Sequence, residues 1–226
     1  MTILETHGEH LLTRAAPLSF FGLQVGTRMT LLRLANGELL LHSPIAISDE
    51  LRTAVDREGT LTQIVCPNVY HHLHAKGWAE AYPKAVVHAP RALAKKRSDL
   101  RIDHALEEAS PKTWNDELVP LHIDGCMLDE TVFIHPASKS VISADLTENF
   151  ATSEDLFTRL YLKAGGIHGK PGWNRLMRFV YRDKRAARRS IDALLEHDFD
   201  RAIIAHGAVL ERDAKEIIRD TFRFLG

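Results

Sequence analysis

The stretch Ile64–Trp78 constrains the fold of this chain more than any other part of its sequence. It begins with a β-branched run that ends at Pro67, carries three histidines (His71, His72 and His74), and continues into an amphipathic segment. This order predicts a strand, a polar turn and a helix. Because strands of layered α/β folds present side chains at their carboxyl ends, we expect part of any functional site here.

Composition places the chain among folded globular proteins, since 45% of its 226 residues are hydrophobic and 26% are charged. We expect residues 1–226 to form a single domain. Lysine and arginine total 29 against 30 acidic residues, which leaves a formal net charge of -1. Without a net positive charge, we expect neither nucleic acid nor membrane as a partner, and the expected partner is a small-molecule substrate or ligand of unknown identity.

The cysteines and the N-terminal residues predict a cytoplasmic protein. Cys66 and Cys126 are too few for a disulfide framework, and both lie in apolar sequence typical of reduced, buried thiols. Glu5, His7 and Glu9 stand where a secretory leader would carry a basic and then an apolar stretch. No apolar run approaches the roughly 20 residues that span a bilayer.

The first half of the chain is predicted to form a β-hairpin followed by alternating strands and helices. Asn36-Gly37 is a two-residue turn signal between strands expected at Met29–Leu34 and Glu38–His42. Ser48 is suited to cap a helix that closes at Gly59. The other expected elements are a strand at Leu23–Val25, strands at Ile64–Cys66 and Ala85–Ala89, and helices at Ala75–Tyr82 and Arg91–Arg97.

The second half repeats this pattern after a polar connector. Thr152 with Asp155 resembles a capping box for a helix that ends at Gly165-Gly166. The other expected elements are the connector Ser98–Pro120, a strand Leu118–Ile123, a hairpin of Thr131–His135 and Ser140–Ile142, an amphipathic segment Trp173–Tyr181, a helix Lys184–His197 capped by Asp183, a strand Arg201–Ala205 and a helix Glu211–Phe224. Such a chain predicts an α/β (α+β) fold, a four-layer αββα sandwich of two mixed β-sheets with helices on the outer faces.

Residues at three predicted strand ends resemble those of the metallo-β-lactamase superfamily. They are Pro67–His74, Ile142–Leu146 and Ile203–Gly207. More closely, the chain resembles a divergent branch of uncharacterised bacterial proteins grouped as a domain of unknown function, the DUF4336 type, and the resemblance extends from Met29 to the end. It implies an αββα sandwich in which histidines and aspartates hold one or two metals. By this resemblance, Asp145 matches the metal-bridging aspartate and His206 matches the last histidine.

The first metal-binding motif of that superfamily, His-x-His-x-Asp-His, is not restored in any register. With the strand ends aligned, Asn68 stands at the first histidine position and His72 at the aspartate position. His122 is the nearest candidate for a further histidine midway along the chain. His42-Ser43-Pro44 stands where an Asp-x-Gly usually ends a strand. The resemblance therefore supports the fold better than it supports a two-metal centre.

Judged by chemistry alone, these residues suit one divalent metal. A catalytic zinc site needs about three protein ligands and an open position for water, and histidine and aspartate supply such ligands. The candidate metal ligands are His72, Asp145 and His206, with His71 or His122 as the fourth, and the candidate catalytic residues are Asn68, His71 and His72. Asn68 would act as a hydrogen-bond partner of the ligands. We expect zinc, with iron or manganese as alternatives, to activate water for attack on a carbonyl or phosphoryl centre.

Each of these residues also has a purely structural interpretation. Histidines before a helix are often polar turn residues, and an aspartate after a strand often bonds turn amides. Two hypotheses follow: a metal-dependent hydrolase with a reduced, mononuclear site, or a non-catalytic, metal-free member that uses the cleft as a small-molecule or protein binding scaffold. Retention of Asp145 and His206 favours the first hypothesis, whereas the incomplete first motif favours the second.

Overall fold

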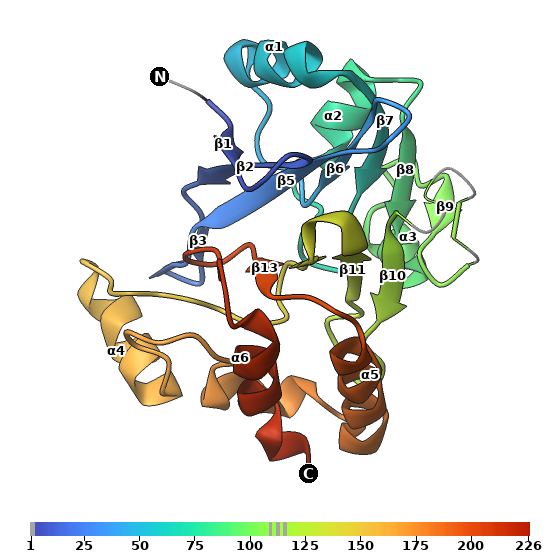
Figure 1. Cartoon of the computed structure of the whole chain (residues 1–226). Helices are drawn as coiled ribbons and strands as arrows, with labels where there is room; N and C mark the ends of the chain where they lie inside the picture. The colour runs from blue at the N-terminus through green and yellow to red at the C-terminus, as the bar shows by residue number, and fades with distance from the viewer. Residues whose placement is uncertain (1–2, 109, 112–113, 115–116) are drawn as a thin grey trace.

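The computed structural model of the chain describes residues 3–108, 110–111, 114 and 117–226. Two sheets lie between two layers of helices, with α1 and α2 over the first sheet and α5 and α6 over the second (Figure 1). The helices are α1 (Asp49–Glu58), α2 (Ala75–Ala81), α3 (Arg91–Lys96), α4 (Leu156–Gly165), α5 (Lys184–Glu196) and α6 (Ala214–Thr221), with 3-10 helices η1 (Pro136–Ser138), η2 (Arg175–Val180) and η3 (Arg223–Leu225). The predicted αββα sandwich is confirmed.

The first sheet has the order β1-β2-β5-β6-β7-β8-β9. Its strands are β1 (Glu5–Thr6), β2 (Leu11–Ala16), β5 (Thr27–Arg33), β6 (Glu38–His42), β7 (Thr60–Val65), β8 (Val86–Ala89) and β9 (His104–Ala105). Pairing is antiparallel from β1 to β6 and parallel from β6 to β9. The expected hairpin around Asn36-Gly37 joins β5 to β6.

The second sheet has the order β10-β11-β12-β13, and a small hairpin of β3 (Ser19–Phe20) and β4 (Leu23–Gln24) stands apart from both sheets. Its strands are β10 (Val119–His122), β11 (Thr131–His135), β12 (Ser140–Ile142) and β13 (Arg201–Ile203). The parallel pairing of β12 with β13 brings the carboxyl ends of these two strands to the same edge. That edge receives the residues that follow Ile142 and Ile203.

Strand side chains alternate between the outer and inner faces of the sandwich, as the two-residue period of a strand requires. Leu41 and Ile64 pack outward with Leu51 of α1 and Trp78 of α2. Their neighbours in sequence pack inward against the second sheet, in a cluster that includes Leu40, Val65, Phe133, Ile142 and Ile203. The outer face of the second sheet is covered by α5 and α6 through Ile191 and Ile218. Each such side chain contributes roughly 1.5–3 kcal/mol when fully buried.

Helix caps explain where several elements begin. The Ser48 hydroxyl accepts a hydrogen bond from the Leu51 amide, and the Asp183 carboxylate accepts from Arg185 and Ala186, so both predicted caps are confirmed. The predicted capping box at Thr152 is wrong. Asp155 is itself the N-cap of α4, because its side chain accepts from the Thr158 amide at 2.7 Å and the helix starts only at Leu156.

Of two other expectations, for the segment Trp173–Tyr181 and for the connector, which is expected to hold short strands or turns, the first differs from the structure and the second agrees with it. An amphipathic segment at Trp173–Tyr181 is expected to place Leu176 and Val180 on the same side, but residues Arg175–Val180 form the 3-10 helix η2, in which Val180 is buried and Leu176 is exposed. The connector Ser98–Pro120 contains the short strand β9, and its residues 109, 112–113 and 115–116 lie outside the described part of the chain. Within the described ranges, no helix combines the length and the apolar character needed to cross a bilayer.

Candidate metal centre

Three side chains from separate strand ends meet at one edge of the sandwich. His71 lies in the loop between β7 and α2, Asp145 follows β12, and His206 follows β13. One ligand atom of each lies within 4.8 Å of the other two. His71 Nε2 is 3.2 Å from His206 Nε2 and 3.4 Å from Asp145 Oδ2, and His206 Nε2 is 3.1 Å from Asp145 Oδ1.

These separations match the spacing of ligands around one small cation. Donor atoms bound tetrahedrally to zinc at about 2.0–2.1 Å lie about 3.3 Å from one another. The contacts of 3.1, 3.2 and 3.4 Å are close to that spacing, with His206 facing Oδ1 of Asp145 and His71 facing Oδ2. Two imidazole nitrogens and one carboxylate also form a donor set that zinc and other divalent transition metals prefer. The residues present therefore fit one divalent metal.

The Nδ1 atoms of both histidine rings lie within hydrogen-bond distance of protein oxygens. His206 Nδ1 lies 2.9 Å from the Gly26 carbonyl oxygen, which only accepts, so Nδ1 carries the hydrogen. His71 Nδ1 lies 2.7 Å from the Ser43 hydroxyl oxygen. Such partners fix the orientation of metal-binding histidines and leave Nε2 as the atom that faces the metal.

Asn68 joins two of the candidate ligands. Its buried side chain donates from Nδ2 to Asp145 Oδ2 at 2.7 Å. Its Oδ1 accepts from the backbone amides of Tyr70 and His71, both at 2.8 Å. One amide group thus holds the Asp145 carboxylate and shapes the turn that aims His71 at it.

Glu130 supports Asp145 from the other side. Its carboxyl group is buried and accepts from the Ala144 amide at 2.7 Å and from the Asp145 amide at 3.0 Å. Burial raises the pKa of Glu130 to about 8, and the charge of Asp145 adds to this effect. Burial also opposes ionisation of Asp145, but His71 and His206 outweigh it and hold the pKa of Asp145 well below its usual range.

His206 and Glu148 are two further ionisable groups at the centre whose pKa values are shifted. Burial alone would lower the pKa of His206, but its hydrogen bond to Asp145 and the charge of that carboxylate raise it to about 9. Burial raises the pKa of Glu148 to about 7, against the attraction of His206. The backbone of Glu148 is held by two hydrogen bonds to Gly172, with lengths of 2.9 and 3.0 Å.

Two of the predicted metal ligands lie outside this group. The His72 ring is buried with Nδ1 2.8 Å from an Arg97 guanidinium nitrogen, and burial together with Lys96 and Arg97 lowers its pKa to about 4. Asn68 accepts hydrogen bonds from the backbone amides of Tyr70 and His71 and so fixes the turn. In this turn His71 faces the centre, and its neighbour His72 faces away. His122 is held 3.4 Å from Asp129 at the end of β10.

The sequence interpretation missed three residues that touch the centre or its ligands. Ser43 directly follows β6, has a positive φ of 54°, and contacts His71 through its hydroxyl. Glu130 had one available signal, an acidic residue directly before a strongly apolar strand. Gly26 acts only through its carbonyl oxygen, which no side-chain pattern reveals.

Comparisons with known proteins agree with this architecture. A family model described as "Domain of unknown function (DUF4336)" matches residues 17–154. A metallo-β-lactamase from Pontibacter korlensis shares 12% sequence identity with a TM-score of 0.66, covering 98% of this chain and 97% of its own. The DIM-1 metallo-β-lactamase exposed to ceftazidime shares 14% identity with a TM-score of 0.66, covering 99% and 97%. No curated protein matches the chain. At these identities the structural likeness shows the fold.

Proposed function

The chain belongs to the family described as a domain of unknown function (DUF4336) and has the metallo-β-lactamase fold, and on this premise we propose that it is a metal-dependent hydrolase with a mononuclear site. The observation that carries the proposal is the convergence of His71, Asp145 and His206. Three ligands of this kind leave a position open, which is typical of catalytic sites and not of structural ones. Zinc is the metal we propose, with iron or manganese as alternatives.

A divalent metal held by these residues would supply Lewis acidity and lower the pKa of water to near neutrality. The protein residues supply the rest. Asp145 brings the negative charge that favours a cation, and Asn68 and Glu130 fix its position through the bonds described above. Hydrolysis of an ester, lactone, thioester or phosphodiester is the reaction class that this chemistry suits.

One observation favours the metal-free alternative. The three side chains also contact one another directly in a closed set, in which Asp145 lies 3.1 and 3.4 Å from the two imidazoles. A protonated His206 paired with an ionised Asp145 stabilises such a cluster without a cation. The cleft would then serve as a binding scaffold for a small molecule or a protein.

Metal content separates the two functions. Protein purified without chelator or metal-affinity resin would be analysed for zinc, iron and manganese, beside a His71→Ala, His206→Ala double variant and a His122→Ala control. We expect near-stoichiometric metal in the wild type and the control and its loss in the double variant. Absence of metal in all three proteins, without a thermal shift on adding any of the metals, would reject the hydrolase and favour the scaffold.

We also propose a cytoplasmic location, supported by the two free cysteines, of which Cys66 is buried. We further propose that the substrate is a small molecule. A screen of ester, lactone, thioester and phosphodiester substrates with the metal-loaded protein would identify it.

A further inference from the structure

The 3-10 helix η2 exposes an apolar row that the fold does not use. A 3-10 helix has three residues per turn, so side chains three positions apart share one row. The three rows are Met177 with Val180, Leu176 with Phe179, and Arg175 with Arg178. The first row packs into the core formed with α5 and α6. The second is exposed, at 49% for Leu176 and 56% for Phe179, and the third flanks it with positive charge.

Helix α4 continues this exposed apolar surface. Thr158, Leu162 and Gly165 are buried on one side of the helix. The opposite side presents large apolar side chains to solvent, namely Leu156, Phe157 and Leu160. An amphipathic helix that faces the core with one side normally carries polar residues on the other. The apolar outer side of α4 therefore needs another explanation.

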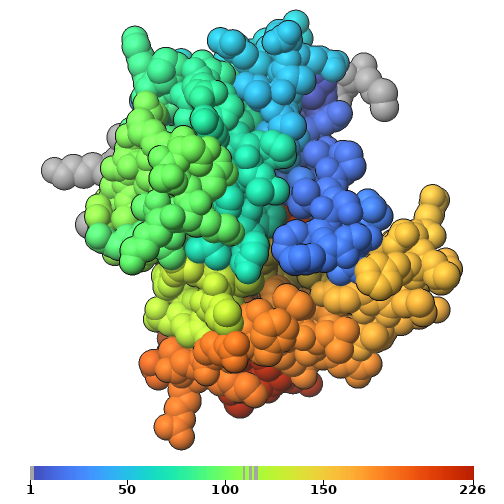
Figure 2. All heavy atoms as spheres, turned by 180° about the vertical axis from the view of Figure 1, so that it is seen from behind, coloured from blue at the N-terminus to red at the C-terminus, as the bar shows by residue number. Residues whose placement is uncertain are grey.

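The β3–β4 hairpin belongs to the same face. The Gln24 amide donates to the Thr158 hydroxyl at 2.8 Å, which fastens the hairpin to the start of α4. At the tip of the hairpin, Phe21 is 88% exposed. Figure 2 shows the blue hairpin region, the yellow-orange α4 and the orange segment that follows it adjoining on one side of the molecule. We call this surface, made of the hairpin tip, α4 and η2, the apolar face.

Charge is distributed unevenly between the apolar face and the rest of the chain. Residues 151–181, which contain α4 and η2, include five lysines and arginines and two acidic residues, Glu154 and Asp155. This segment therefore carries +3, and the remainder of the chain carries -4, which together give the net charge of -1. One of the two carboxylates, Asp155, is occupied as the N-cap of α4.

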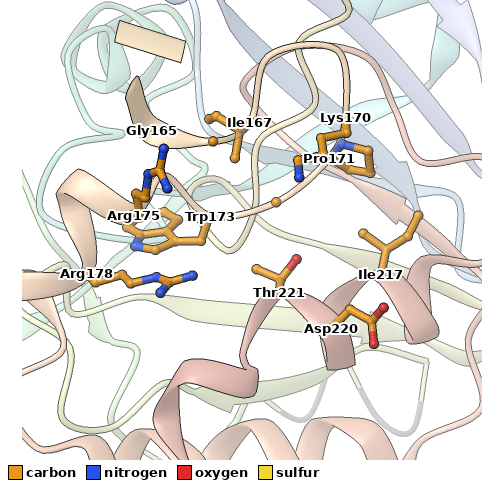
Figure 3. Close-up of a pocket in the computed structure, with 12 residues that line it drawn as sticks. Gly165, Ile167, Lys170, Pro171, Trp173, Arg175, Arg178, Ile217, Asp220 and Thr221 are labelled. Atoms are coloured by element: carbon orange, nitrogen blue, oxygen red, sulfur yellow. The ribbon is translucent and has the colours of Figure 1, made fainter. Parts of the chain in front are cut away.

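A basic cavity lies at the edge of the apolar face. It has a volume of about 490 Å³, and its lining includes Lys170, Arg175 and Arg178. Figure 3 shows Arg175 and Arg178 on one side of the cavity, beside Trp173, with Lys170 across from them. The lining carboxylate of Asp220 is paired with Arg223 at 2.7 Å. The cavity thus presents cationic groups suited to a phosphate.

We propose that the apolar face docks on an anionic lipid bilayer, with the exposed phenylalanines and leucines entering the headgroup region and the basic cavity receiving a lipid phosphate. Apolar side chains beside lysine and arginine are the pattern of proteins that lie on a membrane surface. A nucleic-acid site would be polar, and exposed leucines contribute little to such a site. This docking does not require the proposed hydrolase activity. It does bring the bilayer close to the candidate centre, because Gly26, two residues after β4, binds His206.

Vesicle sedimentation tests the proposal. Full-length protein would be mixed with vesicles of phosphatidylcholine alone, and with vesicles of phosphatidylcholine and phosphatidylglycerol in equal parts. The apolar variant is Leu176→Ser with Phe179→Ser, and the charge variant is Lys163→Glu with Lys170→Glu, all at exposed positions. The matched control, Lys84→Glu with Lys95→Glu, makes the same charge change at exposed positions in the other half of the molecule.

We expect sedimentation with the anionic vesicles only, reduced at least about tenfold in both variants and unchanged in the control. Circular dichroism of each variant would verify that it is folded. Failure of the wild type to sediment with anionic vesicles would overturn the proposal, as would equal losses in the control. The same proteins would be titrated with a fluorescent DNA duplex, and binding to the duplex in place of the vesicles would assign the face to nucleic acid and overturn the lipid assignment.

Discussion

His71 Nε2 lies 3.2 Å from His206 Nε2, although 135 positions separate the two residues in the chain. The His206 ring donates from Nδ1 to a carbonyl, so its neutral form directs a lone pair at His71 and at Asp145. Facing lone pairs repel one another unless a proton or a cation lies between them. The arrangement is therefore one that either binds a metal ion or holds a proton in its place.

Removal of the Asp145 charge should abolish metal binding. Asp145→Asn keeps the shape of the side chain but replaces a carboxylate ligand by an amide. In the wild type, zinc should raise stability as RT ln(1 + [L]/Kd), about 2.7 kcal/mol at a hundredfold excess over Kd. The midpoint of thermal unfolding measured against zinc concentration should rise for the wild type and stay level for Asp145→Asn. Asp129→Asn, which alters the carboxylate beside His122, is the control and should behave as the wild type.

The Ser43 hydroxyl should tune the affinity for metal without being a ligand. Ser43→Ala removes the partner of His71 Nδ1, and loss of such a partner typically costs 10- to 100-fold in metal affinity. Ser143→Ala is a suitable control, because the buried Ser143 hydroxyl has no hydrogen-bond partner among the described residues. Competition with a chelating dye would measure both affinities. Equal affinities for the two variants would show that the Ser43 contact does not orient His71.

The positions of Asp145 and His206 could be predicted from sequence because each follows a short β-branched run. Ile142 and Ile203 end paired parallel strands, so the residues after them must reach one edge of the sheet. The expectation that Asp145 and His206 share one site came from the resemblance to the metallo-β-lactamase superfamily, whereas local pattern predicts the two strand ends. The same reasoning located the hairpin between β5 and β6 and the caps Ser48 and Asp183, because turns and caps depend on residues close in sequence.

The choice between His71 and His72 could not be made from sequence. Both histidines lie in the same turn, and the structure turns His71 inward because Asn68 accepts hydrogen bonds from the amides of Tyr70 and His71. Contacts of Glu130 and Ser43 with the centre arise only when distant strands pack together. The sequence predicted Trp173–Tyr181 as amphipathic but not its backbone geometry, and the exposed row of Leu176 and Phe179 follows only from the three residues per turn of a 3-10 helix.

Replacement of Gly207 should strongly destabilise the protein, because its backbone is left-handed and packs closely against the backbone of Asn149. Its φ is +87°, and a Cβ at this position would lie 2.1 Å from the Asn149 carbonyl oxygen. Gly37 has a similar φ of +81°, but a Cβ there would meet no atom within 4 Å, so Gly37→Ala isolates the effect of the backbone conformation. We expect a loss of about 1 kcal/mol for Gly37→Ala and at least about 3 kcal/mol for Gly207→Ala in urea unfolding.

The position of Gly207 next to His206 adds a second expectation to this comparison. The Asn149 amide bonds the His206 carbonyl at 3.1 Å, so displacement of Asn149 should also move the histidine. Gly207→Ala should therefore lose metal as well as stability, whereas Gly37→Ala should keep its metal. Full metal loading of a folded Gly207→Ala variant would contradict this coupling.

His88 should make the protein less stable as the pH falls, away from the candidate centre. The ring is buried, with Nε2 2.5 Å from Gln63 Oε1, and burial followed by the nearby His104 lowers its pKa to about 4. An unfolded histidine titrates near 6.5, so the unfolded state binds the proton first, and stability is lost as the pH falls from about 6.5 to about 4. The full loss is on the order of 3 kcal/mol. Urea unfolding at several pH values should show a shallower decline for His88→Gln, which does not titrate, than for the wild type. Parallel declines in the two proteins would mean that other groups control the acid sensitivity.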